Sequence, residues 1–283
     1  MSSLGGYGIA GVTTSASVNH NGRPAQGDEE QQRQPLLPKP PTASVAARLR
    51  ANMMADVQRD WADVVLLFCY IVTGLLDSSA ISVWGSFVSM QTGNTVYLGL
   101  GLAAPGESTR WIKSGTSLGC FCIGSFCFSR FHRHFSPRRR WVLCASFTFQ
   151  MALTVAAALI MTFGPASGKE DIGWNALVPI ALVAFQSCGQ AVASRALKYN
   201  SLTSVVLTSI YCDLFSDAEL FAPRNIERNR RGAAPLLLLL GALIGGLFAR
   251  SWVGIAGALW TAALLKLVIV LCWVFWPAEH DPA

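Results

Sequence analysis

Charged residues are scarce in this chain, and that scarcity excludes most soluble folds. Only 13% of its 283 residues are Asp, Glu, Lys or Arg, whereas 52% are hydrophobic. Soluble domains carry about 25% charged residues. The net charge of +6 does not indicate a nucleic-acid partner, because the basic residues lie beside apolar segments, where the positive-inside rule explains them. We therefore expect a protein whose principal partner is the lipid bilayer.

Sequence motifs of soluble enzymes and secreted proteins are also missing. The chain contains no P-loop, no Gly-x-Ser-x-Gly, no His-Glu-x-x-His and no dinucleotide-binding glycine motif. No apolar core of a secretory signal precedes residue 61, and no Asn-x-Ser/Thr sequon occurs. The eight cysteines lack the paired spacing of a disulfide framework or a zinc site. We expect no enzyme activity, no cofactor and no metal centre.

Long apolar runs dominate the remainder of the sequence. There are eight of them, at 61–84, 86–104, 112–131, 141–163, 174–197, 202–221, 234–250 and 252–276. A helix needs about 20 residues to cross a bilayer. The runs at 86–104 and 202–221 are long enough to cross but unusually rich in polar side chains. The sequence therefore predicts an all-α, polytopic transmembrane helix bundle.

Composition also divides the chain into four parts. Residues 1–42 are rich in Ser, Gly, Pro and Gln, which predicts a disordered cytosolic tail. Residues 43–60 mix apolar with charged side chains, which predicts an amphipathic interfacial helix. The transmembrane domain is expected at 61–276, followed by a short tail at 277–283.

The placement of the basic loops favours six crossings over eight. The two strongest basic loops, at residues 130–140 and 224–231, face opposite sides of the membrane if all the apolar runs cross. If the two polar runs are re-entrant or broken segments, about six crossings remain, and both loops and both termini face the cytosol. This arrangement satisfies the positive-inside rule. Non-helical backbone is tolerated at membrane depth only where it lines protein or a cavity, which suits polar runs of this kind.

An internal repeat relates two halves, at about 61–163 and 174–276. Each half contains, in order, a helix with polar residues, a polar segment, a helix with a Gly-x-x-x-Gly pair and an apolar helix. Three crossings per half would invert one copy relative to the other, as in many secondary transporters. The glycine pairs are expected to let neighbouring helices approach closely. They are Gly115 with Gly119 and Gly241 with Gly245.

Asp77 is the principal candidate for a functional residue. An ionisable group inside a spanning helix costs about 2.5–3.5 kcal/mol on insertion scales, so its presence needs a reason. Asp77 is either a proton or cation site that faces a cavity, or a carboxylate that is hydrogen-bonded for packing. Lys266, near the middle of the last apolar run, is a possible ion-pair partner for it, or its side chain could extend toward a membrane interface.

The two polar segments supply further candidates for a substrate or ion site. The first contains a Thr-Gly-Asn-Thr patch, whose glycine could break the helix and free backbone carbonyls. The same side chains could instead be polar contacts between helices. We expect the two segments to approach each other near the middle of the bilayer. The candidates are Thr92, Gly93, Asn94, Thr95, Gln186, Thr208, Ser209 and Tyr211.

These motifs resemble the YoaK-like family of integral membrane proteins, which carry a domain of unknown function. The similarity rests on Gly74–Asp77, on Thr92–Gly99, and on the second-half stretch from Ala184–Ser187 through Val206–Leu214. The second-half stretch is similar to the fungal branch, since bacterial relatives have a second Thr-Gly where this chain has Thr-Ser. The resemblance covers residues 61–276. It implies a membrane protein of about six helices and no established activity.

Two functional hypotheses follow from the polar interior. The first is a transporter or permease for a small solute or ion. The second is a non-transporting membrane scaffold, assembly factor or sensor, and either protein could act as an oligomer. A transporter needs a continuous polar path from Asp77 and Asn94 to one membrane face, whereas a scaffold can be packed solid.

The first testable prediction concerns topology. We expect residues 132–140, residues 222–233 and the C-terminus to lie on the same side of the membrane. Single cysteines placed in these loops of a cysteine-depleted variant should react with an impermeant thiol reagent from the same side of sealed vesicles. Labelling of the two basic loops from opposite sides would exclude the six-crossing arrangement.

Overall fold

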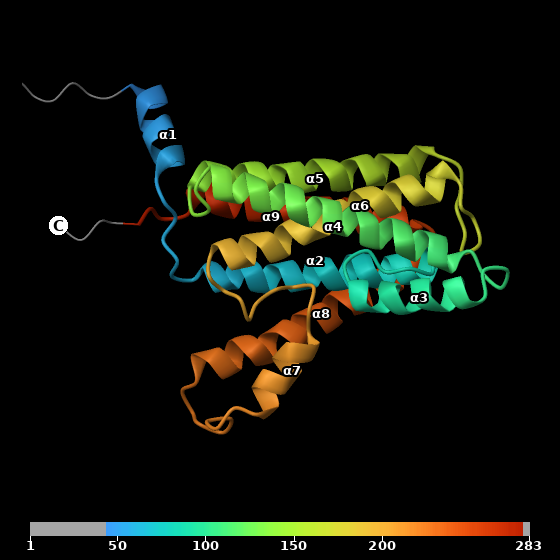
Figure 1. Cartoon of the computed structure of the whole chain (residues 1–283). Coiled ribbons are helices and arrows are strands. Elements are labelled where there is room, and N and C mark those ends of the chain that lie inside the picture. Colours follow the sequence, from blue (N-terminus) through green and yellow to red (C-terminus); the bar gives the residue numbers. More distant parts are fainter. Residues whose placement is uncertain (1–43, 280–283) are drawn as a thin grey trace, which may run out of the picture. The chain divides into compact units, whose positions relative to one another are not determined.

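The computed structural model describes residues 44–279, and these form helices joined by loops (Figure 1). The predicted tail at 1–42 and the end of the predicted tail at 277–283 lie outside the described residues. The helices are α1 (Val45–Met54), α2 (Ala62–Val83), α3 (Gln91–Ala103), α4 (Arg110–His134), α5 (Arg140–Phe163), α6 (Trp174–Ala196), α7 (Thr208–Phe215), α8 (Ile226–Arg250) and α9 (Gly254–Phe275). The predicted all-α fold class is confirmed.

Five helices, α2, α5, α6, α8 and α9, are long and apolar enough to cross a membrane. Helix α4 has comparable length, at 25 residues, but it carries Arg110, Lys113, Arg130 and Arg133. The two polar runs form much shorter helices, of 13 residues in α3 and 8 in α7. At a rise of 1.5 Å per residue, these are about 20 and 12 Å long, against a hydrocarbon thickness of about 30 Å. Neither polar helix is long enough to cross by itself.

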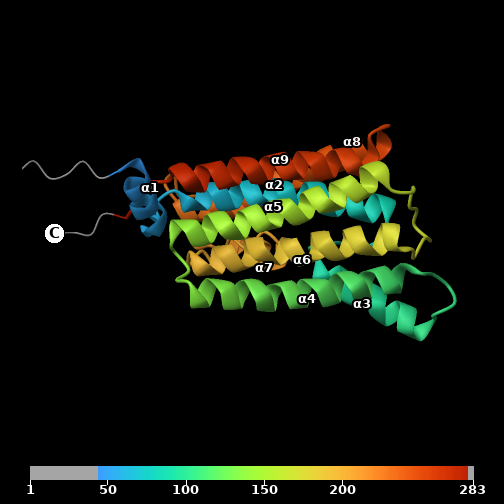
Figure 2. The same cartoon turned by 90° about the horizontal axis from the view of Figure 1, so that it is seen from above.

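Four helices, α2, α5, α6 and α9, enclose most of the hydrophobic core. One cluster of buried side chains includes Leu76, Ile180 and Leu259, and a second includes Phe147 and Trp273. The other helices pack outside this group: α8 lies against α2, α4 against α6, α3 against α4 and α7 against α8. Figure 2 shows α3 and α4 running along one flank of the bundle.

Glycine allows α8 to lie directly on α2. A Cβ atom added at Gly241 would collide with the Ile71 carbonyl oxygen, and one added at Gly245 would collide with the Leu75 carbonyl oxygen. From the opposite side, a Cβ at Gly74 would collide with the backbone of α8. The prediction of a close helix contact at the second glycine pair is therefore confirmed.

The first glycine pair does not form such a contact. A Cβ atom added at Gly119 would have no atom of a neighbouring helix within 4 Å. At Gly115, the nearest such atom would be a Leu98 methyl group at 3.5 Å. The close approach of α4 to α6 occurs instead at Gly124, where a Cβ would lie against the Phe185 carbonyl and the Cys188 sulfur. The prediction missed this because small-residue spacing alone does not determine which face of a helix meets its neighbour.

The two basic loops and the C-terminal segment, which the sequence analysis placed on one side of the membrane, lie at the same end of the bundle. Arg230, in the second turn of α8, forms an ion pair with Asp63, in the first turn of α2, at 2.7 Å. Arg138, before α5, pairs with Glu279, beyond α9, at 2.8 Å. Both basic loops and the end of α9 therefore share one end of the bundle. Helix α1 lies at this end with no buried residue, and its interfacial role stays a prediction (Figure 1).

A matched pair of glycine substitutions tests the α2–α8 contact. Gly245→Ala should lower the free energy of unfolding by about 1–3 kcal/mol, because the added methyl group must displace backbone of α2. Gly119→Ala should be neutral or stabilise by up to about 1 kcal/mol, because it meets open space and improves helix propensity. Thermal unfolding in detergent measures both. Equal melting temperatures for the two variants would contradict this packing.

Candidate functional site

Asp77 holds the irregular backbone that follows α2. Its Oδ1 accepts hydrogen bonds from the backbone N–H groups of Val88 and Ser89, each at 2.9 Å. Its Oδ2 accepts the Ser89 hydroxyl. The carboxylate is buried, and all three donors belong to the non-helical stretch 84–90 that leads into α3. Asp77 therefore acts on its own chain as a fixed acceptor, which favours the packing interpretation over a free cation site.

Asn94 holds the same stretch from the other side. Its Oδ1 accepts the Phe87 N–H at 3.0 Å, and its Nδ2 donates to the Phe87 carbonyl at 2.8 Å. The Nδ2 also donates to Ser117 Oγ on α4 at 3.0 Å. From α6, the Ser187 hydroxyl donates to the Val88 carbonyl at 3.0 Å. Side chains from several helices thus form hydrogen bonds with backbone groups of the stretch 84–90 that have no partner within a helix.

The other members of the Thr-Gly-Asn-Thr patch do not face this interior. Thr92 and Thr95 are exposed on α3, and the Thr95 hydroxyl donates to the Gln91 carbonyl of its own helix at 2.8 Å. Gly93 lies inside α3 and does not break it. A Cβ there would come within 2.8 Å of the Phe87 ring, so the glycine makes room for that ring. Only Asn94 of the patch is buried.

The second polar segment also turns its predicted residues outward. Thr208, Ser209 and Tyr211 are exposed on α7, where Ile210 is the buried residue. Helix α7 packs on α8, whereas α3 packs on α4. Both views place α3 and α7 apart, so the expectation that the two segments approach each other is wrong (Figures 1 and 2). The loop before α7 does reach the interior, through the buried residue Ser204.

A polar cluster lies at the centre of the bundle, with one residue from each of the four core helices. We define the central cluster as Thr73 of α2, Gln150 of α5, Gln190 of α6, Lys266 of α9 and Ser204 of the loop before α7. All five are buried, and Lys266 and Gln150 are fully so. Lys266 Nζ donates to Gln150 Oε1 at 2.9 Å.

Gln190 supplies the second acceptor for the ammonium. Its amide is oriented by the surrounding hydrogen bonds. When its nitrogen donates to Ser204 Oγ at 3.2 Å and to the Cys69 carbonyl at 3.1 Å, its oxygen accepts from Lys266 Nζ at 3.0 Å. Thr73 Oγ1 lies 3.5 Å from the same amide group. The charged group at the centre is therefore held by two neutral amide oxygens.

The predicted pairing of Lys266 with Asp77 is not found. Within residues 44–279, Lys266 forms no ion pair, and the acceptors of Asp77 are filled by backbone and hydroxyl donors. The sequence analysis also missed Gln150, Thr73 and Ser204. A signal for Gln150 was present, since it is the only amide side chain in the apolar run 141–163. Gln186, a predicted candidate, is fully buried, and neither atom of its amide has a hydrogen-bond partner in the described chain.

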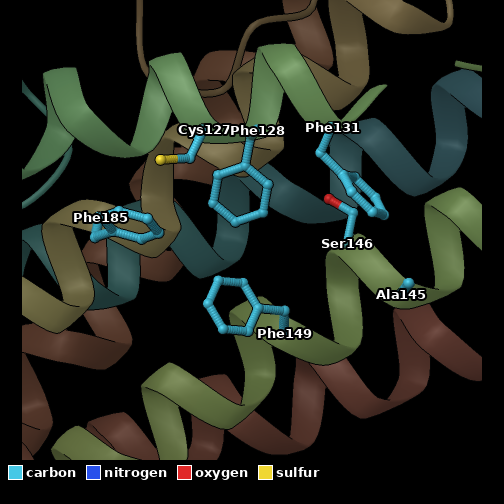
Figure 3. Close-up of a pocket in the computed structure, with 7 residues that line it drawn as sticks. All are labelled: Cys127, Phe128, Phe131, Ala145, Ser146, Phe149 and Phe185. Atoms are coloured by element: carbon cyan, nitrogen blue, oxygen red, sulfur yellow. The ribbon is translucent and has the colours of Figure 1, made fainter. Parts of the chain in front are cut away.

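An apolar hollow of about 330 Å³ lies between α4, α5 and α6. Figure 3 shows aromatic rings around it and one hydroxyl, that of Ser146, on its wall. Gln150 Nε2 lies 3.4 Å from Ser146 Oγ, so a single hydrogen bond separates the hollow from the central cluster. The lining residues are Cys127, Phe128, Phe131, Ala145, Ser146, Phe149 and Phe185. This lining suits apolar groups rather than a column of water.

Five helices capable of crossing a bilayer and a polar cluster buried among them define a multi-pass helical membrane protein. Residues 65–272 match the family described as Protein of unknown function (DUF1275), and the chain belongs to this family. A search of curated proteins and a search of solved structures return no match. The family assigns no activity, so function has to be argued from the geometry.

Two substitutions at Asp77 test its role in holding the backbone. Asp77→Asn should change the free energy of unfolding by less than about 1 kcal/mol, because the amide oxygen can accept both N–H groups and Ser89 can accept from the amide nitrogen. Asp77→Leu should cost about 3 kcal/mol or more, because it leaves three buried donors unsatisfied. Thermal unfolding of the purified protein measures both. A severe loss of stability in Asp77→Asn would show that the charge itself is required.

Proposed function

We propose that the protein is a permease for a small anionic solute, with the central cluster as its binding site. The observation that carries this proposal is the ammonium group of Lys266, which is buried near the middle of α9, is held by neutral amides and lies 5.9 Å from the centre of the Phe147 ring, with no carboxylate as a partner. A charge at the centre of a spanning helix costs about 2.5–3.5 kcal/mol on insertion scales. Buried charges are ordinarily paired. An anionic group is the partner that would complete this site.

Gln186 adds a second reason to expect a ligand. It lies one helical turn before Gln190 on α6, so both amides project from the same face of the helix. Leaving a buried donor or acceptor without a partner costs about 1–3 kcal/mol. A solute bound beside the central cluster would offer hydrogen bonds to this amide as well as a charge to Lys266.

The packing of the two halves supports an inverted repeat with six crossings. Exchanging α2 with α6, α3 with α7, α4 with α8 and α5 with α9 turns most helix contacts into another observed contact, although the α8–α9 contact has no comparable counterpart between α4 and α5. The pair α2–α8 becomes α6–α4, α3–α4 becomes α7–α8, and α5–α6 becomes α9–α2. In secondary transporters with inverted repeats, the substrate site lies near the midplane, where the repeats meet. Gln150 and Lys266 come from the exchanged helices α5 and α9, so the hydrogen bond between them joins the two halves. We place both basic loops on the cytosolic side.

A non-transporting scaffold, assembly factor or sensor is the second candidate function. It is favoured by the use of Asp77 and Asn94 to hold backbone rather than to line a path. It is also favoured by the full burial of Lys266 and Gln150, which leaves the central cluster closed at both ends in this conformation.

Ligand-dependent thermal stabilisation separates the two functions, because a ligand that binds the native state raises its apparent stability. The purified protein in detergent is titrated with sodium salts of phosphate, chloride and short carboxylates. Neutral solutes, and different cations added with one common anion, serve as the comparison. We expect at least one small anion to raise the melting temperature in a saturable manner. The absence of stabilisation by every anion would favour the scaffold.

Variants localise the effect to the central cluster. Gln150→Glu should keep the fold and remove the anion response, because it supplies an internal counter-ion to Lys266. Lys113→Met is the control, since Lys113 is equally buried but donates to the carbonyls of Trp84, Gly168 and Lys169. That variant should melt at a lower temperature and still respond to the anion. An unchanged response in Gln150→Glu would exclude the central cluster as the site.

A further inference from the structure

A basic hollow of about 530 Å³ lies between the ends of α4 and α6, away from the central cluster. It is situated at the end of the bundle that carries the two basic loops, where α4 ends at His134 and α6 ends at Ala196. Its lining residues are Ser129, His132, Arg133, Pro137, Val192, Arg195, Ala196 and Lys198.

His132 is the buried polar group of this hollow. Its side chain is only 2% exposed, and neither Nδ1 nor Nε2 forms a well-aligned hydrogen bond in the described part of the chain, although the Pro137 backbone faces the ring. A buried imidazole without a well-aligned hydrogen bond is unfavourable, because it loses its hydrogen bonds to water and gains little in return. An acceptor bound in the hollow would satisfy its ring N–H.

Three cations surround the hollow without a counter-ion. Arg133, Arg195 and Lys198 are exposed, and none of them forms an ion pair with a carboxylate in residues 44–279. Lys198 adopts a left-handed backbone conformation, with φ of 62°, directly after the end of α6. Glycine is the residue that ordinarily occupies this conformation, so a lysine here adds a charge at the expense of backbone strain.

We propose that this hollow binds the phosphate headgroup of an anionic phospholipid of the surrounding bilayer. Charge complementarity supports a phosphate ligand: two guanidinium groups and an ammonium border the hollow, and the buried imidazole of His132 lies on its wall. Basic pockets between helices at the membrane surface are suited to lipid headgroups.

The surface beside the hollow supports a lipid rather than a free phosphate. Phe126 precedes Ser129 by three residues and Arg133 by seven, so all three lie on one face of α4. Phe126 and the neighbouring Ile123 are 61% and 58% exposed. An acyl chain can lie along this apolar face while its headgroup occupies the hollow. Inorganic phosphate would gain nothing from it.

The simpler interpretation is that these cations only orient the protein and offset the negative ends of α4 and α6. That role depends on charge alone, so any basic residue at this end of the bundle would serve equally. A binding site requires the particular residues around the hollow. The two interpretations therefore make different predictions for an arginine outside the hollow. If only charge matters, its removal should weaken lipid binding as much as removal of an arginine that lines the hollow.

Lipid-dependent stabilisation of the full chain in neutral detergent tests the proposal. The additions are dioleoyl phosphatidylserine, dioleoyl phosphatidylcholine and inorganic phosphate at matched concentrations. We expect only the anionic lipid to raise the melting temperature in a saturable manner. Equal effects of the two lipids, or a phosphate effect as large as that of the anionic lipid, would overturn the proposal.

Variants with matched charge changes decide where the lipid binds. Arg195→Gln should weaken the apparent affinity for phosphatidylserine roughly fivefold, as expected for one cation near a membrane surface. Arg224→Gln removes the same charge from the other basic loop and should leave the affinity unchanged. Lys198→Gly is the sharpest case: it should raise the melting temperature without lipid by relieving strain, yet weaken the response to lipid. Equal losses in Arg195→Gln and Arg224→Gln would show general charge attraction and overturn the site.

Discussion

Every peptide group that leaves a helix inside a bilayer must find its hydrogen-bond partner within the protein, and the rest of this structure depends on how that need is met. In the stretch 84–90, the partners are Asp77, Asn94 and Ser187, which come from α2, α3 and α6. Lys113 does the same for the first residue of this stretch, Trp84, and for the loop 164–173, through three carbonyl oxygens. The cost of these buried polar side chains is thus offset by the peptide groups they satisfy. The irregular stretch in turn positions α3 against α4.

Some of the buried polar residues are explained by the fold alone, and others are not. Asp77, Asn94 and Lys113 have hydrogen-bond partners from the chain itself, so folding explains them. Lys266 keeps an uncompensated charge, and Gln186 and His132 lack well-aligned hydrogen bonds in the described chain. Folding does not explain these three residues, because apolar residues of similar size would be more stable in those positions. A ligand that binds after folding would supply the counter-charge and the hydrogen bonds that these residues lack.

Hydropathy in the sequence was sufficient to predict most of the fold. The apolar runs correspond to the long helices, and the two polar runs correspond to the short helices α3 and α7, because length and burial of apolar surface determine both. The face that each helix presents was harder to predict. Thr92 and Thr95 lie within one turn of Asn94, yet they are exposed, since a step of one or two residues rotates a side chain by about 100° or 200° around the helix. Composition predicts that a segment is polar, but packing decides which of its side chains points inward.

The pairing of charges could not be predicted for the same reason. Asp77 lies well inside the first apolar run and Lys266 near the middle of the last, and opposite charges attract strongly where water is absent. Attraction acts only between groups that the helices bring together, however, and α2 turns Asp77 toward the stretch 84–90 rather than toward α9. The ammonium is left to amides from α5 and α6. A site assembled in this way keeps its net positive charge, which an internal ion pair would have cancelled. This uncompensated charge is the property that makes the centre of the bundle suited to binding an anion.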